Sequence, residues 1–250
     1  MIIGIGIMEK RFRTVEEHTR SFAAFFLDLL FPPRCVYCKK FGKRICDPCA
    51  AGILWIDSRV CRRCGLPFKD RQPHPCIETS HLQFIRSAAE FCGPLRKALH
   101  ALKYDSDRSL AAQLVSLSYP HWSLPTWKFD LLLPVPLGRR RERMRGYNQS
   151  LLLATALSER VNIPVKAECL SRVRETQTQV GLSYGSRKQN MAGAFHAESV
   201  KEKSVLLVDD VCTTGATLLS CADALFQAGA GAVGALTLAR AVLPVTRPAS

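Results

Sequence analysis

The sequence predicts an α/β protein with an open, mostly parallel sheet and flanking helices, preceded by an N-terminal helix and a small cysteine-rich domain. Two observations predict this architecture. Apolar runs of strand length alternate with longer amphipathic stretches in the second half of the chain, which is the pattern of parallel α/β folds. Seven of the 11 cysteines lie between positions 35 and 76. The predicted segments are the N-terminal helix (1–30), the cysteine-rich segment (31–81) and the α/β domain (82–250).

The composition is that of a folded and strongly basic protein. Hydrophobic residues make up 47% of the chain, so it can bury a sizeable core, and Gly and Pro are not enriched enough to indicate disorder. The net charge of +14 favours an anionic partner: a nucleic acid, a phosphorylated metabolite or a membrane surface. A basic protein without such a partner is the alternative that composition leaves open.

The first predicted element is an amphipathic helix over residues 14–30. Thr14 and Glu17 have the spacing of a capping box, and Pro32 ends the helix. Its most apolar part, "SFAAFFLDLLF", is too short to span a bilayer, contains Asp28 and has no small-residue cleavage site. The sequence therefore predicts no transmembrane segment. We expect the helix to pack on the main body, with contact to a membrane surface as the alternative.

Cysteine pairs at metal-ligand spacing mark the second segment. "CVYC" and "CDPC" each let one tight turn present two thiolates, and two such turns complete a tetrahedral zinc site. In a chain without a convincing export signal, such pairs indicate metal-binding thiolates in a reducing cytosol rather than disulfides. The predicted ligands of this structural zinc ion are Cys35, Cys38, Cys46 and Cys49. The run "AAGILWI" that follows predicts a helix with Cys46 and Cys49 on its first turn.

A second cysteine set is incomplete. It consists of Cys61, Cys64 and Cys76, and Thr79 stands where a fourth cysteine would complete the last pair. Substitution by a nearby histidine (His74 or His81), a vestigial site and sharing of the first ion are the alternatives. The spacing leaves open whether one or two zinc ions bind.

Strands and helices alternate through the third segment. The predicted strands are residues 131–135, 204–210 and 232–240, and the predicted helices are 148–161 and 216–230. The strands are apolar on both faces, as in a parallel sheet covered by helices. In the last helix apolar residues recur on one face, and Gly229 or Gly231 ends it.

The stretch "VLLVDDVCTTGATLL" (205–219) carries the strongest functional signal. It places two carboxylates and a Thr-Thr-Gly-x-Thr run at the carboxyl edge of the sheet, where open α/β folds bind ligands. The predicted 5-phosphate loop at the start of the next helix consists of Thr213, Thr214, Gly215, Ala216 and Thr217. Asp209 and Asp210 are too close to that anion to bind it, so we expect them to hold ribose hydroxyls. A solvated turn with a threonine cap is the alternative.

Paired acids before T-T-G-x-T resemble the signature of type I phosphoribosyltransferases. The resemblance implies phosphoribosyl pyrophosphate with magnesium as the ligand, and a sheet of that family's type. It also implies that the loop after strand 131–135 faces the pyrophosphate. The basic candidates in this loop and in the polar stretch 172–195, which could close as a flap, are Arg139, Arg145, Arg172 and Arg187. A solvated helix end and an ordinary surface excursion are the alternatives.

The whole set of motifs resembles the ComF family. The resemblance runs from "LLFPPRCVYC" through "CRRCGLPF", "FCGPLRKALHALKY" and "RRRERMRGYNQS" to "RETQTQVGLSYGSRKQNMAGAF" and the acid pair. It implies a zinc finger ahead of a phosphoribosyltransferase domain and a role in importing or handling single-stranded DNA. A competence helicase and recombination-loading proteins are then candidate partners. The implied location is the cytoplasm, including the periphery of the inner membrane beside the uptake machinery. Thr79 departs from the family pattern.

The sequence supports two classes of function. As a DNA-uptake accessory that binds phosphoribosyl pyrophosphate, the protein would use its basic cysteine-rich segment, in which aromatic residues are interleaved as stacking platforms: Tyr37, Phe41, Trp55 and Phe68. These aromatics could instead cover the small zinc core. As an enzyme, it would transfer ribose 5-phosphate to an acceptor with release of pyrophosphate. No acceptor pocket is recognisable in the sequence. A nucleotide-sensing regulator ranks last, because no helix-turn-helix is visible.

Overall fold

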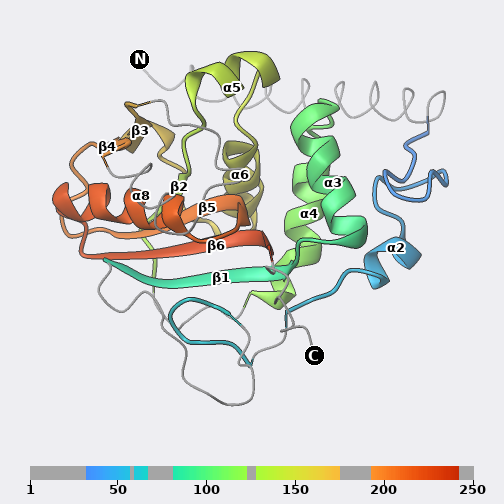
Figure 1. The fold of residues 1–250 in the computed structure, drawn as a ribbon, viewed down its shortest axis with the longest axis horizontal. Coiled ribbons are helices and arrows are strands. Elements are labelled where there is room, and N and C mark those ends of the chain that lie inside the picture. The colour runs from blue at the N-terminus through green and yellow to red at the C-terminus, as the bar shows by residue number, and fades with distance from the viewer. Residues whose placement is uncertain (1–31, 57–58, 67–80, 123–127, 175–192, 242–250) are drawn as a thin grey trace, which may run out of the picture.

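The computed structural model describes residues 32–56, 59–66, 81–122, 128–174 and 193–241. Its elements, with two short 3-10 helices named η, are α2 (Asp47–Ala51), β1 (Leu82–Glu90), α3 (Gly93–Tyr104), α4 (Leu110–Ser118), η1 (Tyr119–His121), β2 (Leu131–Pro134), α5 (Arg139–Arg145), α6 (Gln149–Val161), η2 (Ala167–Cys169), β3 (Leu170–Arg172), β4 (Phe195–Ala197), β5 (Ser204–Cys212), α8 (Ala216–Gln227) and β6 (Ala232–Arg240) (Figure 1). The helix predicted over residues 14–30 lies outside the described residues.

Among the described residues, four parallel strands form the central sheet, in the order β1-β6-β5-β2. The predicted mostly parallel α/β class is thereby confirmed. All four carboxyl ends lie at one edge of the sheet, which is the edge where ligands bind in such folds. β3 and β4 form a separate antiparallel pair.

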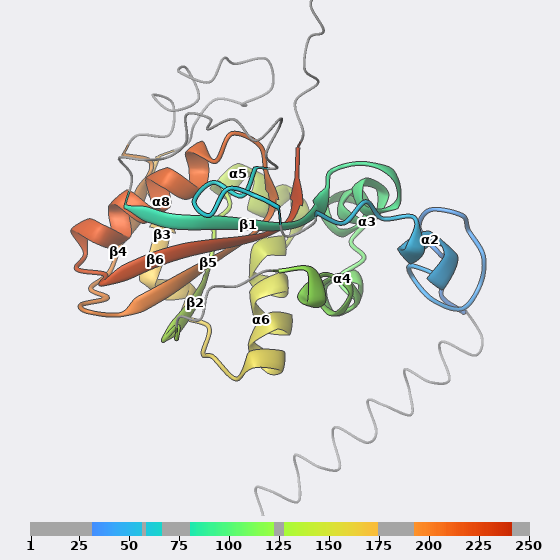
Figure 2. The same ribbon diagram turned by 90° about the horizontal axis from the view of Figure 1, so that it is seen from below.

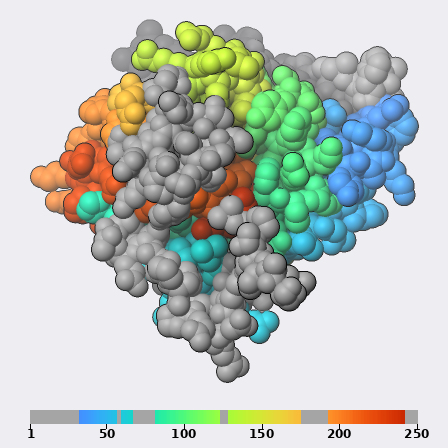
Figure 3. Space-filling model, viewed as in Figure 1, coloured from blue at the N-terminus to red at the C-terminus, as the bar shows by residue number. Residues whose placement is uncertain are grey.

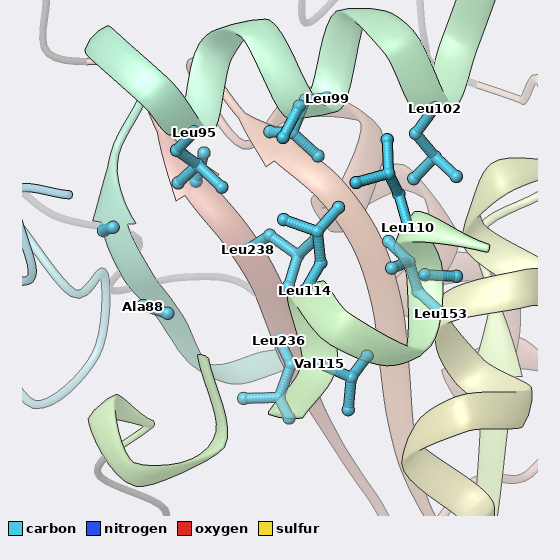
Figure 4. Packing of buried hydrophobic residues seen from close by; sticks show 14 of the residues in the cluster. Ala88, Leu95, Leu99, Leu102, Leu110, Leu114, Val115, Leu153, Leu236 and Leu238 are labelled. Carbon is cyan, nitrogen blue, oxygen red and sulfur yellow. The ribbon is translucent and has the colours of Figure 1, made fainter. Parts of the chain in front are cut away.

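Helices cover both faces of the sheet. α3, α4 and α6 pack on one face, and α8 with the β3–β4 pair packs on the other (Figure 2). Leucine is the most frequent residue in the first of these two cores: Leu99 of α3, Leu114 of α4 and Leu153 of α6 belong to one cluster with Leu236 and Leu238 of β6 (Figure 4). Burial on two faces explains the apolar run of residues 205–208 in β5 and the almost uniformly apolar β6.

The cysteine-rich segment packs directly on this domain. The backbone N–H and C=O of Ile45 bond the side chain of Gln113 in α4, at 3.0 and 2.7 Å. Trp55 forms an antiparallel bridge to Ala89 of β1 and stacks on His121, with ring centroids 3.9 Å apart. The segment therefore shares its core with the α/β domain.

No described helix is long and apolar enough to cross a membrane.

Candidate functional site

The predicted 5-phosphate loop connects β5 to α8. Gly215 has a φ of +82°, and a Cβ built there would lie 3.2 Å from Cδ1 of Ile85, so both the backbone angle and the close packing favour glycine. The N–H of Ala216 lies 3.4 Å from the Thr214 hydroxyl. α8 begins at Ala216, as predicted. The positive end of its dipole therefore lies at residues 213–217, which we call the phosphate loop.

The two acids lie inside β5, which continues for two residues after Asp210. The Ser150 hydroxyl donates to Oδ1 of Asp209 at 2.8 Å, and the Asp210 N–H donates to the same oxygen at 2.9 Å. Asp210 is 4% exposed, and its Oδ2 forms an ion pair with Nζ of Lys103 at the end of α3. The acid pair is thus held by side chains from two helices.

The stretch "RGYNQS" builds this arrangement. Asn148 caps α6 by accepting the Ser150 N–H at 2.9 Å, and its amide donates to the Val135 carbonyl at 3.1 Å. The Tyr147 hydroxyl donates to the Leu102 carbonyl, next to Lys103. The stretch therefore ties α6 and α3 to the carboxyl end of β2.

Sequence reasoning missed Ser150 and Lys103. It considered "RGYNQS" only for its arginines and "LHALKY" only as part of a family resemblance. The available signal was a polar residue two positions after an N-cap asparagine, and a lysine in the last turn of an apolar helix. Neither signal indicates a partner in β5.

The electrostatics of the acid pair favour a proton on Asp209. Burial, and next the charge of Asp210, raise the pKa of Asp209 to about 7. The Ser150 hydroxyl, the Asp210 N–H and Lys103 act in the opposite direction. A group with a raised folded-state pKa binds more protons in the folded than in the unfolded state, so its contribution to stability is lost as the pH rises towards 7.

Asp209→Asn is therefore expected to stabilise the protein at high pH. Relative to wild type, its gain in unfolding free energy should grow by about 2 kcal/mol between pH 5.5 and pH 8, since about 1.5 pH units lie below the folded-state pKa and each is worth roughly 1.4 kcal/mol. Urea unfolding at the two pH values measures it. A gain for Asp209→Asn that is equal at both pH values would contradict the raised pKa.

The described arginine candidates lie in two different places. Arg139 and Arg172 line a pocket of about 290 Å³ between the loop after β2 and the start of β3, together with Asn148. Arg145 instead donates to the Gln149 side chain, and its guanidinium lies 5.2 Å from the ring of Tyr104. α5 and α3 accordingly form adjoining parts of one surface (Figure 3). Arg187 lies outside the described residues.

The first cysteine set is brought together as predicted. The thiol sulfurs of Cys35, Cys38, Cys46 and Cys49 all lie within 4.8 Å of one another, and those of Cys38 and Cys46 are 3.5 Å apart. Four sulfurs at roughly 2.3 Å from a tetrahedral zinc ion would be separated by about 3.8 Å, so the donor set fits zinc. Cys46 caps α2, and Cys49 lies in its first turn.

Backbone groups prepare this site for thiolates. Burial tends to raise the pKa of the Cys35 thiol, but the backbone N–H groups of Cys38, Cys46 and Tyr37 outweigh it and lower the pKa to about 6. Burial raises the pKa of Cys49 instead. One thiol of the set is therefore ready to lose its proton near neutral pH, as metal binding requires.

The second cysteine set is described only in part. Cys61 and Cys64 form a turn in which the Gly65 N–H donates to the Cys61 carbonyl at 3.0 Å. Cys76, Thr79 and His74 lie outside the described residues. Nδ1 of His81 lies 2.8 Å from a carboxylate oxygen of Asp223 in α8. Among the described residues, His81 does not join these cysteines in a metal-ligand group.

Comparisons with known proteins place these features in two families of domains. Residues 26–80 match the double zinc ribbon domain, and residues 148–245 match the phosphoribosyl transferase domain. Among solved structures, adenine phosphoribosyltransferase from Leishmania tarentolae aligns with a TM-score of 0.33 at 15% identity, over 56% of this chain and 74% of that one. The double zinc ribbon and the cysteine cluster together support structural zinc.

Bacterial relatives agree with these matches. The DNA utilization protein YhgH of Escherichia coli strain K12 is 34% identical over 206 residues, covering 78% of this chain and 90% of the relative. Competence protein ComFC of Bacillus subtilis strain 168 is 25% identical over 229 residues, covering 83% and 88%. Competence protein F of Haemophilus influenzae is 40% identical over 116 residues, covering 45% and 51%. The chain belongs to the ComF family and joins a double zinc ribbon to a phosphoribosyltransferase domain.

Proposed function

We propose that this protein binds phosphoribosyl pyrophosphate, or a related ribose 5-phosphate ligand, with magnesium, and that it acts in DNA uptake through the handling of single-stranded DNA. The names of its relatives support a competence-related function. The assignment of the ligand rests on one observation, which is the order of chemical groups from β5 into the start of α8. Two carboxylates precede a turn with a positive-φ glycine at a helix start, at the carboxyl edge of a parallel sheet.

The expected role of each group in ligand binding follows from its charge. The N–H groups of the phosphate loop would bind the 5-phosphate, because they point toward an anion at the positive end of the α8 dipole. Asp209 would accept a hydrogen bond from a ribose hydroxyl, while Ser150 keeps its carboxylate in position. Asp210 would support Asp209 without contacting the ligand, since it is buried and paired with Lys103. Magnesium would neutralise the pyrophosphate when the full ligand is bound.

Calorimetric titration with phosphoribosyl pyrophosphate and magnesium tests this function. Wild type is expected to bind, and the double variant Asp209→Asn with Asp210→Asn is expected to lose affinity by about 100-fold or more, because it removes the carboxylate that would accept from the ribose hydroxyl and the buried carboxylate that supports it. Asp223→Asn, a change of one exposed carboxylate on α8, is the matched control and should bind like wild type. Undiminished magnesium-dependent affinity in the double variant would refute the site.

An enzymatic role is the second candidate, and one observation favours it. The pocket of about 290 Å³ beside Arg139 and Arg172 offers space for an acceptor next to the loop after β2. If the protein is a phosphoribosyltransferase, wild type mixed with phosphoribosyl pyrophosphate and a panel of nucleobases will release pyrophosphate. Binding without release from any acceptor would favour the accessory role.

The DNA part of the proposal is supported by the segment from Cys35 to Cys46, which we call the first cysteine turn. Phe41 is 60% exposed and lies 4.3 Å below the guanidinium of Arg34, and Tyr37 is 49% exposed. An exposed aromatic beside a cation suits stacking with bases of a single strand. Trp55, predicted as a further platform, instead stacks on His121 and covers the core. Phe68 lies outside the described residues. A single-stranded oligonucleotide titrated into wild type should bind with strong salt dependence, and no binding at low salt would restrict the proposal to the sugar phosphate.

A further inference from the structure

The turn that carries Cys61 and Cys64 is docked on β1, on the strand residue that also contacts the phosphate loop. We call residues 61–65 the second knuckle. The Ile85 N–H donates to the Arg63 carbonyl at 2.7 Å. A Cβ built on Gly65 would lie 2.4 Å from the Ile85 carbonyl oxygen, a distance that real Cβ atoms do not reach. The second knuckle therefore touches the backbone of Ile85 with no space between them (residues 59–66 lie beside β1 in Figure 1).

The side chain of Ile85 extends this contact to the phosphate loop. Its Cδ1 lies 3.2 Å from the position that a Cβ on Gly215 would occupy. Ile85 is 1% exposed, so it fills the space between the knuckle and the loop. Because protein interiors are closely packed, a shift of the knuckle against Ile85 is transmitted to Gly215 rather than absorbed.

A buried arginine makes a second connection between the same two places. Arg240, the last residue of β6, is 4% exposed, and its Nη1 donates to the Cys64 carbonyl at 2.8 Å. It pairs in register with Cys212, the last residue of β5, whose carbonyl accepts the Ala241 N–H at 2.9 Å. Burial raises the pKa of the Cys212 thiol, and the neighbouring Arg240 opposes this rise. Arg240 thus spans from the knuckle to the residue that precedes the phosphate loop.

The guanidinium of Arg240 is buried. Within the described part of the chain, Arg240 has no carboxylate in ion-pair contact, and its Nε makes no hydrogen bond. A guanidinium buried without an anion costs free energy, and a fold retains it only where something compensates. The Cys64 carbonyl supplies part of the compensation. An anion in the phosphate loop, which begins one residue after Cys212, would supply more.

We propose that Arg240 is a positioning residue that couples the second knuckle to the phosphate loop, so that the integrity of the knuckle sets the affinity of the loop for a phosphate ester. With the knuckle in place, Arg240 and Ile85 hold the turn after Cys212 in the shape that presents its N–H groups. With the knuckle displaced, the loop must be ordered at the expense of binding free energy. This inference rests on the proposed sugar-phosphate function and gives the zinc ribbon a part in it.

Titration of the full-length, zinc-loaded protein with ribose 5-phosphate tests the coupling. Arg240→Met should lower the affinity about tenfold or more, and Arg240→Lys, which keeps the charge near Cys212, should recover part of the loss. Gly65→Ala should also lower it, because its Cβ forces the knuckle away from Ile85. Ile85→Val removes only Cδ1 and is the milder variant for the case that Gly65→Ala does not fold.

Gly42→Ala is the matched control. Gly42 lies in the first cysteine turn, has a φ of +120° and would meet nothing within 4 Å. Alanine at this position therefore imposes a backbone strain at least as large as at Gly65, but in another turn, and should leave the affinity for ribose 5-phosphate unchanged. Thermal unfolding of each variant, with titrations performed well below its midpoint, separates affinity from stability.

The outcomes are distinct. Absence of binding by wild type would overturn the proposed function itself. Binding by wild type together with unchanged affinity in Arg240→Met and in the knuckle variants, whichever of them fold, would overturn only the coupling. An equal loss in Gly42→Ala and Gly65→Ala would also overturn it, because general strain in the ribbon would then explain the effect.

Discussion

Removal of zinc, or replacement of Cys49 by serine, is expected to unfold the first cysteine turn and α2 while β5 and β6 stay folded. Cys35, Ile45, Cys49 and Ile53 are the core residues that this part contributes, too few to order it without a metal. Zinc binding supplies on the order of 10 kcal/mol to small cysteine domains, which is comparable to the stability of a whole protein. The segment should therefore lose its structure when one ligand is lost.

Hydrogen exchange measures this result directly. The amides of Lys39 and Ala50, which bond the Cys35 and Cys46 carbonyls at 2.9 and 2.8 Å, should lose protection, and the bound zinc should fall by one equivalent. Cys92→Ser is the matched control, because Cys92 is the N-cap of α3 and belongs to no described metal-ligand group. Protected amides in zinc-free protein would show that packing alone holds the segment.

Lys103→Met is expected to destabilise the whole protein by about 3 kcal/mol, because it leaves the buried Asp210 carboxylate without its cation. Adding Asp210→Asn should restore most of the lost stability, since no uncompensated charge then remains. Urea unfolding of both variants at pH 7.5 provides the measurement. Failure of the second change to restore stability would show that Lys103 acts through packing rather than charge.

The exposed pair of Lys43 and Asp47 offers a control of the same chemistry. Their side chains are 60% and 78% exposed and 2.7 Å apart, against 20% and 6% for Lys103 and Asp210. Lys43→Met should therefore change stability by at most about 1 kcal/mol. Equal effects of the two lysine variants would contradict the importance of burial at the acid pair.

The sequence predicted the elements whose pattern is local. β6 has the predicted bounds, since eight apolar or small residues follow Gly231 and end at the charged Arg240. β1 was missed, because Gln83, Arg86 and Ser87 interrupt its apolar pattern. The structure accounts for the buried Ser87: its hydroxyl lies 2.6 Å from that of Thr237 in β6, and a partner 150 residues away leaves no local signal.

The candidate site was predictable to the same extent. The phosphate loop and the first cysteine set are continuous or regularly spaced, so their chemistry can be read from residue types. Lys103 reaches Asp210 from α3, and Ser150 reaches Asp209 from 59 residues away. These contacts depend on how helices pack over the sheet, which periodicity does not specify. Their roles in ligand binding stay predictions.

The covering of β1 also limits how the chain can be divided. β1 is an outer strand of the sheet. Its Ile85 and Glu90 N–H groups donate to carbonyls of the cysteine-rich segment, and the Ile56 N–H of that segment donates to a carbonyl of β1. An excised α/β portion would carry a bare row of amide and carbonyl groups along this flank, open to pairing with a second copy. The cysteine-rich segment thus covers the outer edge of the sheet, in addition to carrying the metal-ligating cysteines. Truncations, fusions and shuffled variants that omit it would tend to self-associate.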